Sequence, residues 1–201
     1  MPGRTFTTLL DRAQHQYGFL TPDDARELDI DPTQLRLMAS RDTLEHLGHG
    51  LYRMPAVQPN ELDAYMEAVL RTGRRGVISH ETALDLYELC DVNPASIHLT
   101  VPKGFRTRKQ LPTAYQLHQA DLSPDEVSSH EGIPIVTAER AIRGGVERAL
   151  GWHLIDQAIR NARGRGLIDQ ATAKRLRALR GAPGSPAEKP ATVGSAGSRR
   201  A

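Results

Sequence analysis

The chain has a single cysteine, Cys90, and no hydrophobic run long enough to cross a membrane. One thiol excludes an internal disulfide and any zinc site built on several cysteines. Its place at the apolar end of a helical pattern indicates a buried small hydrophobic residue. The N-terminus lacks the extended apolar core of a signal peptide. We therefore expect a cytoplasmic protein that has no membrane partner.

The net charge of the chain is also small. The 201 residues include 26 lysines and arginines against 24 acidic residues, which gives a formal charge of +2. This excess is too small to indicate a nucleic-acid-binding protein by itself, so any affinity for phosphate must come from local arrangement. The local arrangement is uneven, because basic residues gather at 103–109 and along 143–180, whereas 61–88 carries many of the acids.

Motifs typical of common enzyme classes are missing. The sequence contains no Gly-x-Ser-x-Gly, no Walker-type lysine loop and no Rossmann glycine fingerprint. A DNA-processing enzyme would need a metal-binding carboxylate cluster. The acids considered for such a cluster lie near one another in the sequence but in an expected loop and hairpin, namely Asp121, Asp125, Glu126 and Glu131. We expect no catalytic residue and no cofactor.

Eight histidines raise the question of a metal site. His46 and His49 flank a glycine turn and do not share one face of a helix. No cysteine or carboxylate pair completes a set of four metal ligands with them. His80 stands at an expected helix start and is expected to be solvated, while His98 and His118 fall in strand patterns. We expect no bound metal.

The region 21–54 is the most informative stretch. Thr21 can cap a helix that begins at Pro22, with Asp24 completing a capping box, and Asp31 with Pro32 repeats the device for a second helix. Only a turn separates the two helices. This order of parts predicts a helix-turn-helix, preceded by a first helix over residues 5–17 and an extended segment at 19–20.

Helical phase divides the second helix into two faces. With Leu35 pointing inward, Met38 and Ala39 lie beside it. In a helix-turn-helix the second helix enters the major groove, where arginine suits guanine, serine or threonine suits several base edges, and an apolar side chain can touch a thymine methyl. The residues turned outward are Thr33, Arg36, Leu37, Ser40 and Arg41.

Two short apolar segments at 44–47 and 51–54 surround Gly48, His49 and Gly50. The two glycines tolerate the positive φ that a tight hairpin requires. The resulting ribbon would complete a winged helix-turn-helix, with His49 and Arg53 on the wing near the DNA backbone.

Proline residues at 55 and 59 break the pattern and place a first domain boundary near residue 57. The expected organisation is a DNA-binding domain at 1–57, an α+β domain at 58–180 and a disordered tail at 181–201. The second domain is expected to contain a small antiparallel group of strands between helices. The expected helices are 60–72, 80–89, 137–149, 152–162 and 169–180, and the expected strands are 96–101, 114–119, 126–129 and 133–136.

Four spaced blocks carry a likeness to a known family. They are GLYR at 50–53, VISHETAL at 77–84, IHLTVP at 97–102 and GIPIVT at 132–137. Together they resemble the AbiEi family of antitoxins, the DNA-binding halves of type IV toxin–antitoxin operons, over roughly residues 5–180.

The resemblance implies a repressor that binds inverted repeats in its own operon and a C-terminal domain that counters a nucleotidyltransferase toxin. It also implies a monomer in solution or a protein that pairs on DNA. Residues implied for DNA contact are Thr33, Gln34, Arg36, Ser40, Arg41, His49 and Arg53. Residues implied for a basic face on the C-terminal domain, which would contact the toxin or the DNA backbone, are Arg106, Arg108, Lys109, Arg160 and Arg163.

Two alternatives remain at the level of the sequence. The winged helix could be a protein-interaction module that never touches DNA, or the chain could be a simple transcriptional regulator without a toxin partner. Strong dependence of duplex binding on salt would favour DNA recognition over the first alternative.

Overall fold

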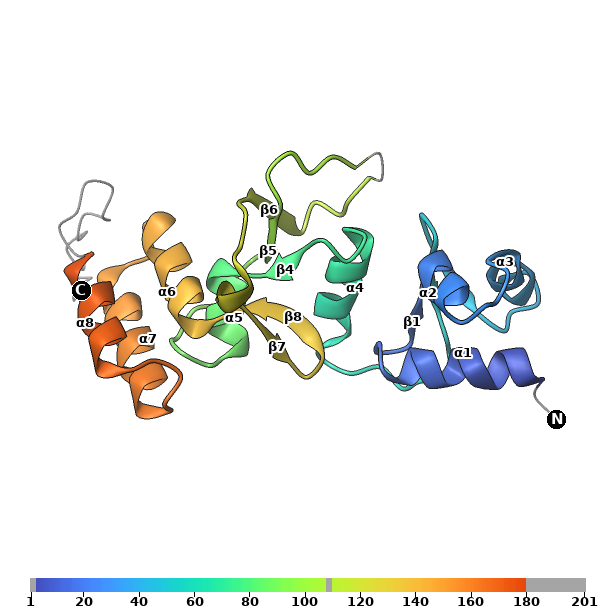
Figure 1. Cartoon of the computed structure of the whole chain (residues 1–201), viewed down its shortest axis with the longest axis horizontal. Coiled ribbons are helices and arrows are strands. Elements are labelled where there is room, and N and C mark those ends of the chain that lie inside the picture. Colours follow the sequence, from blue (N-terminus) through green and yellow to red (C-terminus); the bar gives the residue numbers. More distant parts are fainter. Residues whose placement is uncertain (1–2, 108–109, 180–201) are drawn as a thin grey trace, which may run out of the picture.

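The computed structural model describes residues 3–107 and 110–179. Its elements follow one another from an N-terminal helical unit to a central sheet and then to a group of helices (Figure 1). The N-terminal unit comprises α1 (Arg4–Gln14), β1 (Phe19–Leu20), α2 (Pro22–Glu27), α3 (Thr33–Ala39), β2 (Glu45–Gly48) and β3 (Leu51–Arg53). The remaining elements make up the second unit. They are α4 (Asp63–Arg71), β4 (Val77–Ile78), α5 (His80–Leu86), β5 (Ile97–Val101), β6 (Tyr115–Gln119), the 3-10 helix η1 (Pro124–Glu126), β7 (Val127–His130), β8 (Ile133–Val136), α6 (Ala138–Glu147), α7 (Trp152–Gly164) and α8 (Gln170–Ala178).

The helix starts of the N-terminal unit follow the capping pattern of the sequence. The Thr21 hydroxyl accepts a hydrogen bond from the Asp24 backbone N–H, and the Asp24 carboxylate accepts one from the Thr21 backbone N–H. The Asp31 carboxylate accepts a hydrogen bond from the Thr33 backbone N–H at 2.8 Å. These bonds satisfy amides that have no partner inside their helices. The predicted helix-turn-helix is therefore confirmed.

A three-stranded antiparallel sheet completes this unit in the order β1-β3-β2. The β2–β3 turn passes through Gly48, His49 and Gly50, all of which have positive φ. The expected wing is present, and the extended segment at 19–20 adds a third strand to it. The helices and the sheet enclose a small core that includes Leu9, Leu20, Leu35, Tyr52 and Met54.

The second sheet has five strands in the order β6-β5-β4-β8-β7. The α+β class is confirmed, but the expectation of an antiparallel sheet is corrected for two of its four pairings. Strand β5 runs parallel to β6, and β4 runs parallel to β8, whereas β4–β5 and β7–β8 are antiparallel. Alternation along a strand predicts its two faces but carries no information about the direction of its neighbour.

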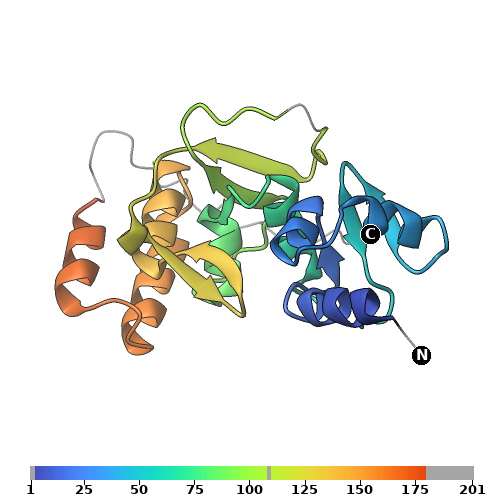
Figure 2. The ribbon, with the colours of Figure 1, turned by 45° about the vertical axis from the view of Figure 1, so that its right-hand side comes forward.

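Helices α6, α7 and α8 lie at the end of the molecule opposite to α1–α3, with the sheet between them (Figures 1 and 2). Thr137 caps α6 by accepting a hydrogen bond from the Arg140 backbone N–H, and Asp169 caps α8 by accepting one from the Thr172 backbone N–H. A large core joins the sheet to these helices and also takes in Phe19 and Leu51 of the N-terminal unit. Because this core crosses residue 57, the division at that position stays a prediction. The expected tail at 181–201 lies outside the described residues.

The described helices include none that is both long and apolar enough to cross a membrane.

Candidate nucleic-acid interface

Helix α3 presents the polar face that its helical phase predicts. Leu35 is fully buried and anchors the helix in the small core. The opposite side is exposed to solvent and carries the residues expected at the interface, namely Thr33, Gln34, Arg36, Ser40 and Arg41. Hydrogen-bonding groups and cations thus project from a helix whose inner side is fixed by packing.

The arginines of α3 and its C-terminal flank differ from others in the same unit. Arg12 and Arg26 pair with the carboxylates of Glu27 and Asp23, respectively. Arg36 and Arg41 form no ion pair with any residue that the structure describes. Their guanidinium groups are therefore available to phosphates or to guanine edges without first losing a carboxylate partner.

The wing and α3 border one open hollow of about 550 Å³. Arg36 and Ser40 line it from the helix, and His46 and His49 line it from the hairpin. His49 is exposed at the tip of the turn, while the His46 ring stacks on Tyr52 with ring centroids 4.9 Å apart. The structure therefore brings His49 together with the predicted residues of α3. His46 also belongs to this surface, although helical phase could not identify a residue on a strand.

Arg53 does not lie with these residues. Its Nη1 is 2.7 Å from Asp63 Oδ2 of α4, and its side chain is only 14% exposed. The guanidinium also lies over the Phe19 ring, 5.1 Å from the ring centroid. Strand β3 is the central strand of its sheet, so this side chain points into the junction with α4 rather than along the wing. The geometry gives Arg53 a structural role in place of the expected DNA contact.

A second charged connection crosses the same junction. The fully buried Asp24 carboxylate receives hydrogen bonds from Gln16, Arg12 and Arg74, and Arg74 follows α4. Burial by itself would raise the pKa of Asp24, but the Thr21 hydroxyl and the Arg74 charge outweigh it and lower the pKa. Asp24, which completes the capping box of α2, is therefore also the residue through which Arg74 of the second unit holds the N-terminal unit.

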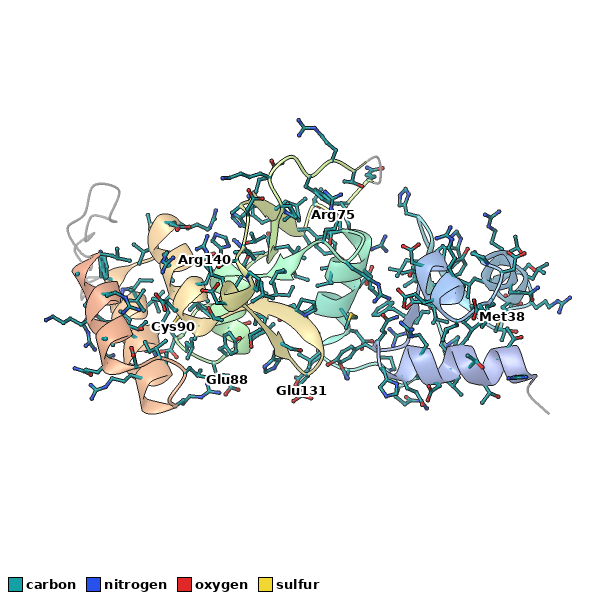
Figure 3. The ribbon with its side chains drawn as sticks, in the orientation of Figure 1. Met38, Arg75, Glu88, Cys90, Glu131 and Arg140 are labelled. Carbon is teal, nitrogen blue, oxygen red and sulfur yellow. The ribbon has the colours of Figure 1, made fainter. Side chains whose placement is uncertain are left out.

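Backbone acceptors complete the junction. The Tyr17 hydroxyl donates to the Glu131 carbonyl at 2.6 Å, where Figure 3 shows Glu131 at the turn between β7 and β8. Arg71 of α4 donates to the Leu47 carbonyl in the wing at 3.2 Å. The wing and the segment that follows α1 are thus each tied to the second unit, which fixes the orientation of the α3 face.

The loop between β5 and β6 reaches the wing. Gln110 and Leu111 line the same small pocket as His49 and Gly50 of the hairpin. In both views of the ribbon this loop and the hairpin lie side by side (Figures 1 and 2). The base of the loop is anchored by Phe105, which is 6% exposed.

Cations flank this loop. Arg106 is exposed and forms no ion pair with a described residue, while Lys103 Nζ lies 3.8 Å from Asp121. The Arg75 guanidinium lies over the Phe105 ring at 4.7 Å from its centroid (Figure 3). Arg108 and Lys109 lie outside the described residues. Arg160 and Arg163 are exposed on α7, at the opposite end of the molecule. Arg106 therefore does not share a face with Arg160 and Arg163.

The N-terminal unit is not basic overall. Residues 1–57 contain six arginines and no lysine, against eight acidic residues. Since DNA binding releases counterions in proportion to the phosphates neutralised, this unit alone has few cations to offer. Neighbouring basic groups of the second unit therefore matter to any contact with the DNA backbone.

Three histidines meet inside the second unit, which the sequence did not predict. The His80 and His118 rings stack with centroids 3.8 Å apart, and His98 Nδ1 lies 3.0 Å from His118 Nε2. His80 is 5% exposed, which corrects the expectation that it is solvated. Gly144 of α6 leaves room for its ring, because a Cβ at that position would lie 2.9 Å from His80 Cδ2.

Charged neighbours surround this histidine cluster. Glu81 accepts a hydrogen bond from Arg148 at 2.9 Å and lies 3.3 Å from His98 Nδ1. Burial, followed by the charges of neighbouring groups, lowers the pKa of His80 to about 3 and that of His118 to about 4. Burial also lowers the pKa of His98, although Glu81 opposes the shift. The cluster is therefore neutral near pH 7.

Only part of this histidine cluster could be predicted from the sequence. Strand alternation places His98 and Thr100 on one face of β5, and the parallel register pairs Thr100 with His118. That register was not predictable from alternation. The backbone of His80 has φ +53°, a conformation that no sequence rule assigns to a histidine at a helix start.

The acids considered for a metal site are dispersed. Asp121 pairs with Lys103, whereas Glu126 lies within ion-pair distance of Arg140 and Arg143. Among the described residues, no group of three or more histidine, cysteine or acidic side chains is arranged to hold a metal ion. Cys90 is buried as predicted, and burial raises the pKa of its thiol to about 11.

Comparison with known proteins locates the family likeness. Residues 8–55 match the sequence model of a family described as "Transcriptional regulator, AbiEi antitoxin", which confirms the resemblance over α1, α2, α3 and the wing. Among solved structures, the crystal structure of the RV2827C protein from Mycobacterium tuberculosis is similar with a TM-score of 0.52. The two sequences are 12% identical, and the likeness covers 89% of this chain and 72% of that chain, so it concerns the fold alone. No curated protein matches the sequence.

Proposed function

From the match of residues 8–55 to a family described as AbiEi antitoxin transcriptional regulators, we propose that the chain represses its own operon by binding inverted-repeat operator DNA. The observation that carries the proposal is the pair of exposed arginines, Arg36 and Arg41, which have no ion-pair partner among the described residues. Arginine is the side chain best suited to guanine edges in the major groove.

In this proposal α3 enters the major groove. Thr33, Gln34 and Ser40 contact base edges or nearby phosphates, together with the two arginines. His49 at the tip of the wing lies next to the adjacent backbone. Arg53 is not part of the interface, because Asp63 and the Phe19 ring hold its guanidinium.

In this proposal the loop between β5 and β6, called the basic loop below, extends the DNA-binding surface formed by α3 and the wing. Arg106 and Lys103 contact phosphates beside the groove that α3 occupies. Support for this contact comes from Gln110 and Leu111 of the same loop, which share a pocket with the wing. The excess of acids over bases in residues 1–57 makes such contacts necessary for a useful affinity. Inverted repeats further supply two half-sites, each of which binds one copy of the chain.

We further propose that the second unit counters a nucleotidyltransferase toxin. Arg160 and Arg163 on α7 are exposed at the end of the molecule far from α3 (Figure 1). A partner that docks there would leave the DNA-binding face free. Repression and toxin neutralisation would then use separate surfaces of one chain.

The DNA-binding proposal is tested by gel shift on the promoter of the chain's own operon. The parent should give a specific, salt-sensitive complex, and Arg36→Ala or Arg41→Ala should each weaken binding by about 1–3 kcal/mol and relax the base preference. Arg26→Ala is a matched control, since its guanidinium pairs with Asp23 on α2. Parent-like binding by both α3 variants would exclude the proposed interface.

The antitoxin proposal is tested by rescue of cells that express the toxin from the neighbouring gene. The Arg36→Ala/Arg41→Ala double variant should still rescue growth, while Arg160→Glu/Arg163→Glu should lose rescue and retain operator binding. If the parent chain gives no rescue from a neighbouring nucleotidyltransferase, the chain is a regulator without that partner.

A further inference from the structure

One apolar side chain interrupts the polar face of α3. Leu37 is 46% exposed, and among the described residues Leu167 is the only other large hydrophobic side chain with comparable exposure. Most leucines in this chain are buried or packed against one of the two cores. Leu37 is absent from both cores, including their partly buried margins.

Packing within the chain does not account for this leucine. Leu35 and Met38 fasten α3 to the small core, with Leu35 fully buried and Met38 at its edge. Leu37 points away from them by the geometry of the helix. Replacing it should therefore leave the fold intact, which allows its function to be tested separately from stability.

The surroundings of Leu37 indicate what it contacts. Gln34 lies one turn before it and Arg41 one turn after it, and both are exposed. Ser40 donates its hydroxyl hydrogen bond to the Leu37 carbonyl at 2.9 Å. An apolar surface for docking a protein would need several neighbouring hydrophobic side chains. Leu37 is instead a single hydrophobic group among hydrogen-bonding and cationic groups.

Such a mixture matches the edges of base pairs in the major groove. Guanine and adenine present hydrogen-bonding atoms there, and the only apolar feature on any base edge is the C5 methyl group of thymine. A leucine cannot form a side-chain hydrogen bond, but it gains free energy by removing a methyl group from water.

We propose that Leu37 is a specificity-determining residue that contacts the methyl group of a thymine in each half-site. This inference rests on the proposed function, because it requires α3 to lie in the major groove. It adds an apolar contact to the polar ones expected from Thr33, Gln34, Arg36, Ser40 and Arg41, and it predicts a thymine in each half-site at the base step facing the middle of α3.

The test removes only the methyl group. Duplexes that the full chain selects from a random pool are resynthesised with uracil in place of one thymine at a time. For the parent, one such replacement in a half-site should weaken binding roughly three- to fivefold, as expected for one buried methyl group. For Leu37→Ala the same replacement should have no effect, so that the thymine duplex and the uracil duplex bind with equal affinity.

Arg36→Ala serves as the matched control, because it weakens binding but should retain the parent's sensitivity to that uracil. The proposal is overturned if no single replacement affects the parent, or if Leu37→Ala loses as much affinity as the parent on replacement. Loss of toxin rescue by Leu37→Ala with unchanged DNA binding would assign the leucine to a protein partner and also overturn it. A parent that selects no duplex at all would overturn the proposed function itself, which is a distinguishable result.

Discussion

Arginines occupy two contrasting regions of the molecule. On α3 and its C-terminal flank, Arg36 and Arg41 are exposed and form no ion pair with a described residue. At the junction between the N-terminal unit and α4, Arg53 and Arg74 pair with Asp63 and Asp24. Arginine side chains are therefore free to bind a ligand in the first region, whereas in the second region they hold two parts of the chain together.

The contrast shows that an arginine on a winged helix-turn-helix is not by itself a candidate for a DNA contact. Arg53 lies in a strand of the wing, where sequence order suggests a backbone contact. Its low exposure and its carboxylate partner instead make it part of the protein interior. An arginine that is available to bind a ligand is distinguished from one that stabilises the fold by its exposure and by whether a carboxylate pairs with it, not by its residue type.

The largest expected effect is on stability at the junction. Arg53→Ala leaves the Asp63 carboxylate, which is 14% exposed, without its cation, and should lower the free energy of unfolding by roughly 2–3 kcal/mol. Urea unfolding followed by circular dichroism measures this change. Arg26→Ala is the control, since its pair with Asp23 is exposed and should be worth less than about 0.5 kcal/mol.

The Arg53→Met/Asp63→Leu double variant sharpens this prediction, because replacing both charges with apolar groups should restore part of the lost stability. Equal stability of Arg53→Ala and Arg26→Ala would contradict the distinction between the two regions.

An effect of similar size on stability is expected from acid. The pKa of His80 is about 3 in the folded chain, whereas an unfolded histidine titrates near about 6.5. Below pH 6.5 the unfolded chain therefore binds more protons, and stability is lost as the pH falls toward the folded pKa. By pH 5 the loss from His80 should be roughly 2 kcal/mol, with His118 adding to it in the same direction.

Unfolding experiments at pH 7 and pH 5 measure this loss. His80→Asn should reduce the difference between the two pH values, because asparagine tolerates the left-handed backbone and does not titrate. His153→Asn is the control on an exposed histidine and should leave the difference unchanged. If His80→Asn is as acid-sensitive as the parent, the histidine cluster is not the source of the effect.

The smallest expected effect concerns the basic loop. Arg106→Ala should weaken binding of every sequence alike and should reduce the slope of log affinity against log salt concentration by about 0.9, the value for one phosphate contact. Arg160→Ala, at the far end of the molecule, should leave the slope unchanged. A slope that is the same for both variants would remove the loop from the DNA-binding surface.

The sequence predicted the elements whose signals are local. Thr21, Asp24 and Asp31 revealed two helix starts, Gly48 and Gly50 revealed the hairpin, and the period of α3 placed Leu35 inside. What it could not predict depends on groups distant in the chain. The pairing of Arg74 with Asp24, the parallel register of β5 with β6 and the meeting of His80 with His118 each join segments that share no local pattern.

Parallel measurement of operator affinity and unfolding free energy for Arg36→Ala and Arg53→Ala tests the separation of the two regions most directly. We expect Arg36→Ala to lose about 1–3 kcal/mol of binding and to unfold like the parent. Arg53→Ala should lose stability but, under conditions where it is fully folded, bind the operator nearly like the parent. The reverse pattern, with Arg53→Ala deficient in binding and Arg36→Ala unaffected, would contradict the proposed interface.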